Sequence, residues 1–207
     1  GRIGFTLEGE YGRAKPCTHA GAYQRSRRVN LVGGYDVNLE QIHSFKKIYP
    51  KCLVNRKNEK LKEFLIRTKP NLVSVSCSSD QHLKVLRELI SAYKKGLPLK
   101  GILVEKPLGM NFEEACKIKK MLAKCNLKVV VCHDRRFMTE YQEFYRMHLL
   151  RKKYGLGELR HIRGAIHCAS VVSGRKGQER VFGGPMLHDG THLIDLMLFL
   201  VGKPRLV

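Results

Sequence analysis

The tripeptide Glu105-Lys106-Pro107 is the part of the sequence whose residue types point most directly to chemistry. It closes the apolar run 101–105, which has the length and composition of a buried strand. Pro107 fixes its own φ and favours an extended Lys106, so that the ammonium projects beyond the carboxyl end of the strand. Open α/β sheets bind their ligands at that edge. The tripeptide therefore predicts a cation aimed into a ligand site, and a solvated charge pair at a strand end is the structural alternative.

Short β-branched runs alternate along the chain with amphipathic stretches of helical length. Strands are predicted at 29–36, 72–77, 101–105 and 127–132, and helices at 39–48, 59–68, 82–95 and 112–124. Asn111 is the expected N-cap of the last helix, because two glutamates follow it in the first turn. This alternation predicts an α/β fold with a parallel, doubly wound sheet.

Two glycines and an aspartate suggest a nucleotide site. Gly1 and Gly4 have the spacing of the second and third glycines of the G-x-G-x-x-G motif, which lets the backbone approach a pyrophosphate. Asp36 ends the strand predicted at 29–36, where an acidic side chain can accept hydrogen bonds from an adenosine ribose. A carboxylate there favours NAD over NADP, although Asp36 would also suit a turn ahead of Leu39.

Taken together, these segments resemble the Gfo/Idh/MocA family of nicotinamide-dependent oxidoreductases, which act mostly on sugars, inositols and related polyols. The resemblance rests on Asp36 and on the segments 1–4, 19–22, 77–82, 105–107, 134–137, 155–158 and 183–195. It implies a Rossmann-type NAD-binding domain over 1–131, with its first strand missing from the sequence. It also implies the beginning of an α+β substrate-binding domain over 132–207, truncated at Val207.

The resemblance also implies roles for individual residues. Lys106 would bind the reacting hydroxyl and relay its proton, and His192 would assist that transfer. The cofactor would be NAD, with NADP as the alternative. Its expected contacts are Gly1, Gly4, Asp36, Cys77, Ser78, His82, Glu105 and Lys106.

The sequence departs from the family pattern in two places. The aspartate usually found four residues before the active histidine is replaced by His188, and the neighbouring residue is Asp189. Either side chain could complete the catalytic site with Lys106 and His192. The stretch from Leu7 to Cys17 resembles an insertion whose role the sequence does not indicate.

Two other kinds of chemistry are compatible with pairs of residues in the sequence. His188 and His192 are four residues apart, so on one face of a helix they could bind a metal ion together. The H-E-x-x-H pattern is absent, however, and no metal site is predicted. Cys132 beside His133 could form a nucleophile pair, although cysteines at strand ends are more often inert. Asp195, one turn after His192, would orient its imidazole or pack structurally.

Composition limits the partners and the cellular setting. The net charge of +21 attracts anions, but the basic residues are spread through the predicted helices, which favours solvated faces over a nucleic-acid interface. Seven scattered cysteines without a C-x-x-C pattern predict a reducing, cytoplasmic setting. No apolar run approaches the roughly 20 residues of a membrane span.

The sequence therefore predicts an NAD-dependent oxidoreductase that acts on a CH–OH group of a sugar, inositol or related polyol, or on the matching ketone. The family resemblance implies a homo-oligomer formed through the second-domain sheet of the full-length protein. A non-catalytic nucleotide-binding or regulatory protein of the same fold is the first alternative. A basic nucleic-acid-binding protein is the second.

Overall fold

The structure is a computed structural model that describes residues 2–155, 157–167 and 186–202. The chain divides into two compact units, unit 1 (Gly1–Val130) and unit 2 (Val131–Val207).

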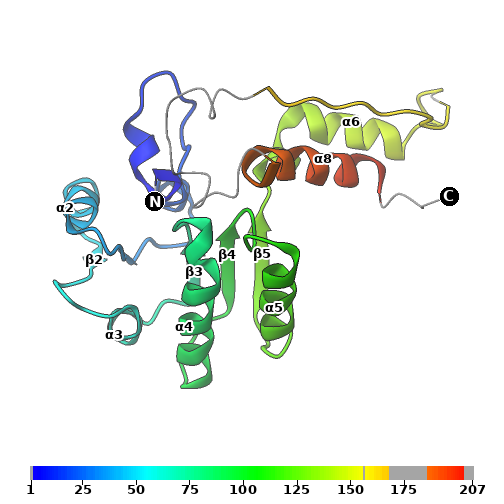
Figure 1. Cartoon of the computed structure of the whole chain (residues 1–207). Coiled ribbons are helices and arrows are strands. Elements are labelled where there is room, and N and C mark those ends of the chain that lie inside the picture. Colours follow the sequence, from blue (N-terminus) through cyan, green and yellow to red (C-terminus); the bar gives the residue numbers. More distant parts are fainter. Residues whose placement is uncertain (1, 156, 168–185, 203–207) are drawn as a thin grey trace. The chain divides into compact units, whose positions relative to one another are not determined.

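Unit 1 alternates strands and helices along the chain (Figure 1). Its helices are α1 (His19–Arg25), α2 (Leu39–Ile48), α3 (Leu61–Thr68), α4 (His82–Lys94) and α5 (Phe112–Leu122), with 3-10 turns η1 (Arg2–Gly4), η2 (Thr6–Gly9) and η3 (Ser79–Gln81). Its strands are β1 (Gly33–Gly34), β2 (Leu53–Val54), β3 (Leu72–Val75) and β4 (Gly101–Glu105), and β5 (Lys128–Cys132) runs across the boundary into unit 2.

The strands form two parallel sheets, one of order β1-β2 and one of order β3-β4-β5. In the larger sheet Leu72 pairs with Gly101, and Val75 pairs with Val104, which is fully buried. In the smaller sheet Gly33 pairs with Leu53. A Cβ on Gly33 would lie 2.6 Å from the carbonyl oxygen of Leu53, so this close pairing requires glycine. The parallel pairing and the alternating helices confirm the predicted α/β class.

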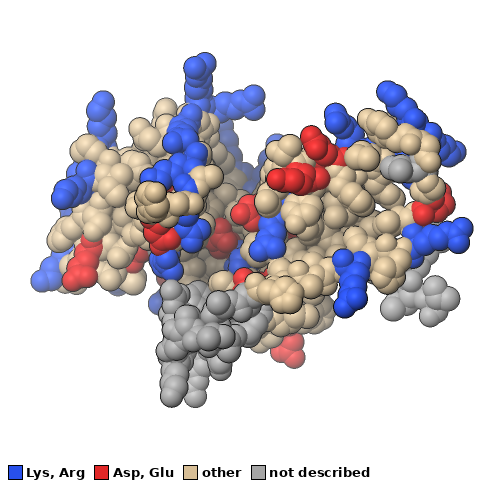
Figure 2. Space-filling model, turned by 90° about the horizontal axis from the view of Figure 1, so that it is seen from above, with Lys and Arg blue, Asp and Glu red and all other residues tan. Residues whose placement is uncertain are grey.

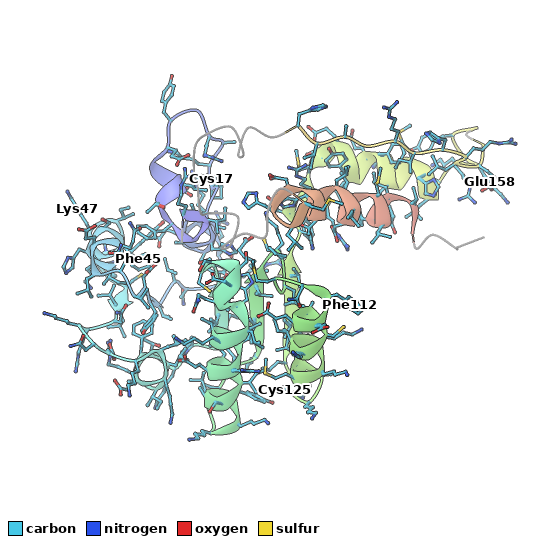
Figure 3. The ribbon with its side chains drawn as sticks, viewed as in Figure 1. Cys17, Phe45, Lys47, Phe112, Cys125 and Glu158 are labelled. Carbon is cyan, nitrogen blue, oxygen red and sulfur yellow. The ribbon has the colours of Figure 1, made fainter. Side chains whose placement is uncertain are left out.

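Helices cover the sheets with their apolar faces. In Figure 3, Phe45 points from α2 toward the interior of unit 1, whereas Lys47 points away from it. Phe45 is buried and packs edge-to-face against Phe5, at 5.4 Å between ring centroids. Helices α4 and α5 lie side by side against the three-stranded sheet (Figure 1), with Leu86, Leu89 and Ile118 buried beneath them. The predicted N-cap of α5 is confirmed, because the Asn111 side chain accepts a bond from the Glu114 amide.

One ion pair ties α3 to β2. Arg67 donates from Nε and Nη2 to the Glu59 carboxylate at 2.9 and 2.8 Å, and Nη2 also donates to the Val54 carbonyl. The Arg56 amide donates to the same carboxylate at 2.7 Å. These bonds, the Arg67 side chain first, lower the pKa of Glu59 from 4.5 to about 2. The hydrogen bonds between the end of α3 and the residues that follow β2 therefore depend on an ionised Glu59.

We expect Glu59→Gln to lower the free energy of unfolding by roughly 1–3 kcal/mol at pH 7, because the amide loses a charge-assisted, two-point bond. A carboxylate whose pKa is depressed on folding stabilises the native state above its ordinary pKa. The difference from wild type should therefore shrink as the pH falls from about 4.5 to about 2. Urea unfolding across this pH range measures it, and Glu40→Gln, an exposed change on α2, should show no such dependence.

Unit 2 is built from helices in its described part. It contains the 3-10 turn η4 (Asp134–Phe137), α6 (Thr139–Leu149), the π-helical turn η5 (Met186–Gly190) and α8 (Thr191–Val201). Helices α6 and α8 pack together, with Tyr145 stacked on Phe199 at 4.5 Å between centroids. Among the described residues, no helix is long and apolar enough to cross a membrane.

The positive charge is dispersed on the surface. Figure 2 shows Lys and Arg side chains projecting from many separate places on the visible face, with uncharged surface between them.

Candidate active site

The tripeptide at the end of β4 is held by a histidine on either side. Glu105 is the last residue of β4, and its Oε2 accepts a bond from the Lys106 amide at 3.3 Å. Its Oε1 lies 2.8 Å from Nε2 of His19, the first residue of α1. Nδ1 of His82, the first residue of α4, lies 2.9 Å from the Pro107 carbonyl oxygen. The first residues of α1 and α4 thus hold the chain on either side of Lys106. Lys106 itself is half-buried.

Four of the predicted cofactor contacts line one cavity of about 910 Å³ in unit 1. They are Gly4, Asp36, Cys77 and Ser78. Asp36 follows β1, and Cys77 and Ser78 follow β3, so the polar end of the cavity lies at the carboxyl ends of parallel strands. Farther along, apolar residues of both sheets line it. Its volume falls within the range of about 300–1,000 Å³ that is typical of ligand pockets.

Asp36 is fixed at the rim of this cavity through its backbone. Its amide donates to Asn55 Oδ1, and its carbonyl accepts from Asn55 Nδ2, both at 3.1 Å. Its own Oδ1 accepts from the Asn38 amide at 3.0 Å, so the turn expected ahead of Leu39 is present. The two interpretations of Asp36 are compatible, because a carboxylate has about four acceptor positions.

The loop after β3 offers polar groups but no reactive thiol. Burial raises the pKa of Cys77 to about 11, which keeps it protonated at neutral pH. A hydrogen bond from the Ser78 side chain lowers the pKa of Asp80, as does a second bond from Gln81. Cys77 can therefore offer a ligand van der Waals contacts and backbone hydrogen-bonding groups, while Ser78 can offer a hydroxyl.

The remaining predicted catalytic residues lie in unit 2. His188 and Asp189 belong to the π-helical turn η5, where His188 Nδ1 is 3.1 Å from Asp189 Oδ2. His192 lies in the first turn of α8, and its Nδ1 is 3.8 Å from Asp134 Oδ1. The Asp189 side chain is 18% exposed and that of His188 is 41% exposed. Single π-helical turns occur frequently at functional sites.

Neighbouring residues in unit 2 build a further network around His192. The His133 ring meets the His192 ring edge-on, with 6.1 Å between centroids, and its Nδ1 is 3.7 Å from Asp195 Oδ2. Asp195 accepts from both Nε and Nη2 of Arg136, which raises the pKa of that guanidinium. The Asp195 carboxylate thus pairs with Arg136 and lies close to His133, and Asp134 is a neighbour of His192 that sequence reasoning missed.

Within unit 1, the structure places the predicted site residues in two groups. Gly4, Asp36, Cys77 and Ser78 line the cavity, and His82, Glu105 and Lys106 meet at the end of β4. His188, Asp189 and His192 lie in unit 2. Gly1 lies outside the described residues. Sequence reasoning assigned no role to His19 or Asn55, which hold Glu105 and Asp36.

Comparison with known proteins identifies a family and solved structures that this chain resembles. A family model described as an oxidoreductase family with an NAD-binding Rossmann fold matches residues 11–133. No curated protein matches the chain in sequence.

Solved structures share the fold at low sequence identity. A proposed myo-inositol dehydrogenase from Sinorhizobium meliloti is 17% identical, with a TM-score of 0.69 over 90% of this chain and 52% of that one. A proposed NADPH-dependent oxidoreductase from Desulfitobacterium hafniense is 22% identical, with a TM-score of 0.68 over 88% and 51%. The WlbA dehydrogenase from Bordetella pertussis, in complex with NADH and UDP-GlcNAcA, is 18% identical, with a TM-score of 0.67 over 89% and 51%. The chain spans about half the length of these relatives.

Proposed function

Because the chain belongs to the Gfo/Idh/MocA family of oxidoreductases with an NAD-binding Rossmann fold, we propose that it is an NAD-dependent dehydrogenase of sugar-like polyols. It oxidises a secondary alcohol of a sugar, inositol or related polyol, or reduces the matching ketone. The observation that carries the proposal is Lys106, which follows a buried parallel strand between the bonds made by Glu105 and Pro107. Structural relatives that include a WlbA dehydrogenase with NADH and UDP-GlcNAcA support the substrate class.

The residues of unit 1 fit a dinucleotide. Gly4 lines the cavity and approaches the end of β3 so closely that a Cβ would lie 2.8 Å from Ser76 Oγ. Asp36 provides a carboxylate for ribose hydroxyls at the same cavity, and the net charge of +21 attracts phosphates. NAD, when bound, supplies the two-electron acceptor of the reaction.

Lys106 and His192 transfer the proton of the reacting hydroxyl. In the direction of oxidation, Lys106 Nζ binds the substrate hydroxyl and accepts its proton as the carbon loses a hydride. His192 assists this transfer, and Asp189 or His188 completes the set. In the reverse direction the protonated Nζ donates to the ketone oxygen.

The proposal assigns one role to each part of the chain. Residues 1–131 form the cofactor domain, and residues 132–207 begin the substrate domain. The homo-oligomer expected through the second-domain sheet also remains part of the proposal. A reducing, cytoplasmic setting is supported by the seven cysteines, which contain no C-x-x-C pattern.

We expect the protein to bind NADH about tenfold more tightly than NADPH, because the Asp36 carboxylate accepts bonds from ribose hydroxyls and repels a 2′-phosphate. Fluorescence titration of both cofactors measures the ratio. Asp36→Ser should reduce the preference several-fold, because serine keeps a turn acceptor for Asn38 and removes the charge.

The control for this experiment is Glu40→Gln, which removes one negative charge from the exposed face of α2. It should leave the NADH preference unchanged, which separates a local contact from the overall charge. Tighter binding of NADPH than of NADH by the wild-type protein would show that the assignment of Asp36 is wrong.

Two other functions give different results in the same assays. A non-catalytic nucleotide-binding protein binds NADH but turns over none of a panel of polyols and keto-sugars. A nucleic-acid-binding protein, for which the net charge is the supporting observation, binds duplex DNA with an affinity that falls steeply with salt. NADH titration, the substrate panel and a salt series on DNA binding therefore separate the three.

A further inference from the structure

The Glu105 carboxylate connects the start of α1 to Lys106. One oxygen lies 2.8 Å from His19 Nε2, and the other accepts from the Lys106 amide at 3.3 Å. The side chains of His19 and Glu105 are 8% and 12% exposed. A bond to a carboxylate in such a shielded place is stronger than one at the surface.

The two residues that precede His19 are held in turn by Glu8, which belongs to the 3-10 turn η2. Glu8 Oε2 accepts from Thr18 Oγ1 at 2.8 Å and from the Cys17 amide at 3.1 Å. Thr18 is the N-cap of α1, and its Oγ1 accepts from the Gly21 amide at 3.0 Å. The bond from the Thr18 hydroxyl is the main reason that the pKa of Glu8 is lowered.

Two further details show how closely Glu8 fits the start of α1. A Cβ at Gly21 would overlap the Glu8 carboxylate, so the contact depends on glycine at this position. Cys17, labelled in Figure 3, ends the segment Leu7–Cys17 that the sequence left without a role. Glu8 lies in that segment and accepts a bond from Thr18, the N-cap that directly precedes His19.

We infer that His19 is a positioning residue for Lys106, acting through Glu105, and that the segment Leu7–Cys17 exists to hold His19 through Glu8. The inference rests on the proposed catalytic role of Lys106. His19 fixes the Glu105 carboxylate, which then fixes the backbone from which the Lys106 side chain projects. Without His19 the carboxylate turns toward solvent and releases the Lys106 amide.

The sequence allows this amide to be observed almost alone. Glu-Lys occurs only at Glu59-Lys60 and Glu105-Lys106. Protein labelled with ¹³C-carbonyl glutamate and ¹⁵N-lysine therefore gives two carbonyl–amide correlations, and Lys106→Arg identifies one by its loss. The Lys60 amide, which donates to Glu63 Oε2 in another part of the fold, is the internal reference.

We expect His19→Phe to speed exchange of the Lys106 amide with solvent about tenfold while Lys60 is unchanged. His19→Gln should restore most of the protection, because its amide nitrogen can reach the place of Nε2. His43→Phe, an exposed change on α2, should have no effect. If His19→Phe speeds both amides, the fold itself is damaged, and the smaller His19→Asn then decides. Unchanged Lys106 exchange in a folded His19 variant would overturn the inference.

The role of Glu8 is tested by comparing two alanine variants of the same segment. Glu8→Ala should speed Lys106 exchange several-fold, whereas Glu10→Ala, which removes the ion pairs with Arg2 and Arg13 from the same segment, should not. Equal effects of the two changes, or none from Glu8→Ala, would overturn the role of the segment. Exchange is read without cofactor or substrate, so a failure to find turnover would contradict the proposed function and leave this result standing.

Discussion

Replacing Lys106 with alanine is expected to lower turnover by roughly two or more orders of magnitude, the usual effect of removing a positioned acid or base. Folding and NADH affinity should change little, because the bonds of Glu105 to His19 and of Pro107 to His82 hold the backbone on either side of position 106. The substrate is found first by screening polyols with NAD, and steady-state rates are then compared with those of wild type.

Lys106→Arg provides the matched control for charge. It keeps a cation at the end of β4 but should not restore turnover, because guanidinium stays protonated at working pH and cannot relay a proton. Wild-type rates in Lys106→Ala would mean that Lys106 is a surface charge and that the proposed mechanism is wrong. Binding of NADH without turnover of any polyol or keto-sugar would favour the non-catalytic alternative.

Local patterns predicted most of the elements of unit 1. Helix α2 (Leu39–Ile48) and strand β4 (Gly101–Glu105) have the predicted bounds, since each combines a clear apolar period with a recognisable boundary residue. The strand predicted at 29–36 is reduced to Gly33–Gly34, and Leu53–Val54 was not predicted at all. Both depend on pairing between segments about 20 residues apart, which leaves no periodic signal in either one.

The site was predictable where one segment carries a motif. Lys106, His82 and Asp36 were named from short motifs, and the structure places them at the carboxyl ends of strands or at a helix start. The residues that hold these three in place through hydrogen bonds were not predictable. His19 and Glu105 are separated by 86 residues, and nothing in the composition of either segment indicates that they pair. Only the packing of α1 against the end of β4 brings them together.

The same distinction applies to unit 2, where the sequence left His188 and Asp189 as alternative partners of His192. A π-helical turn has one more residue than an α-helical turn, and η5 places His188 and Asp189 in such a turn directly before α8. The helical periodicity used with the sequence assumes 3.6 residues per turn and therefore left both residues as candidates. The greater burial of the Asp189 side chain favours the aspartate.

We therefore expect His192→Ala and Asp189→Ala each to lower turnover, by about a hundredfold and about tenfold, whereas His188→Ala changes it less than about threefold. His192 would assist the proton transfer directly, and the proposed role of the Asp189 carboxylate is to stabilise the protonated imidazole. Rates are measured under the conditions used for Lys106→Ala, with His161→Ala, an exposed change in unit 2, as the control. A larger loss in His188→Ala than in Asp189→Ala would assign the role to His188. Wild-type rates in His192→Ala would show that unit 2 provides no proton-transfer group at this position.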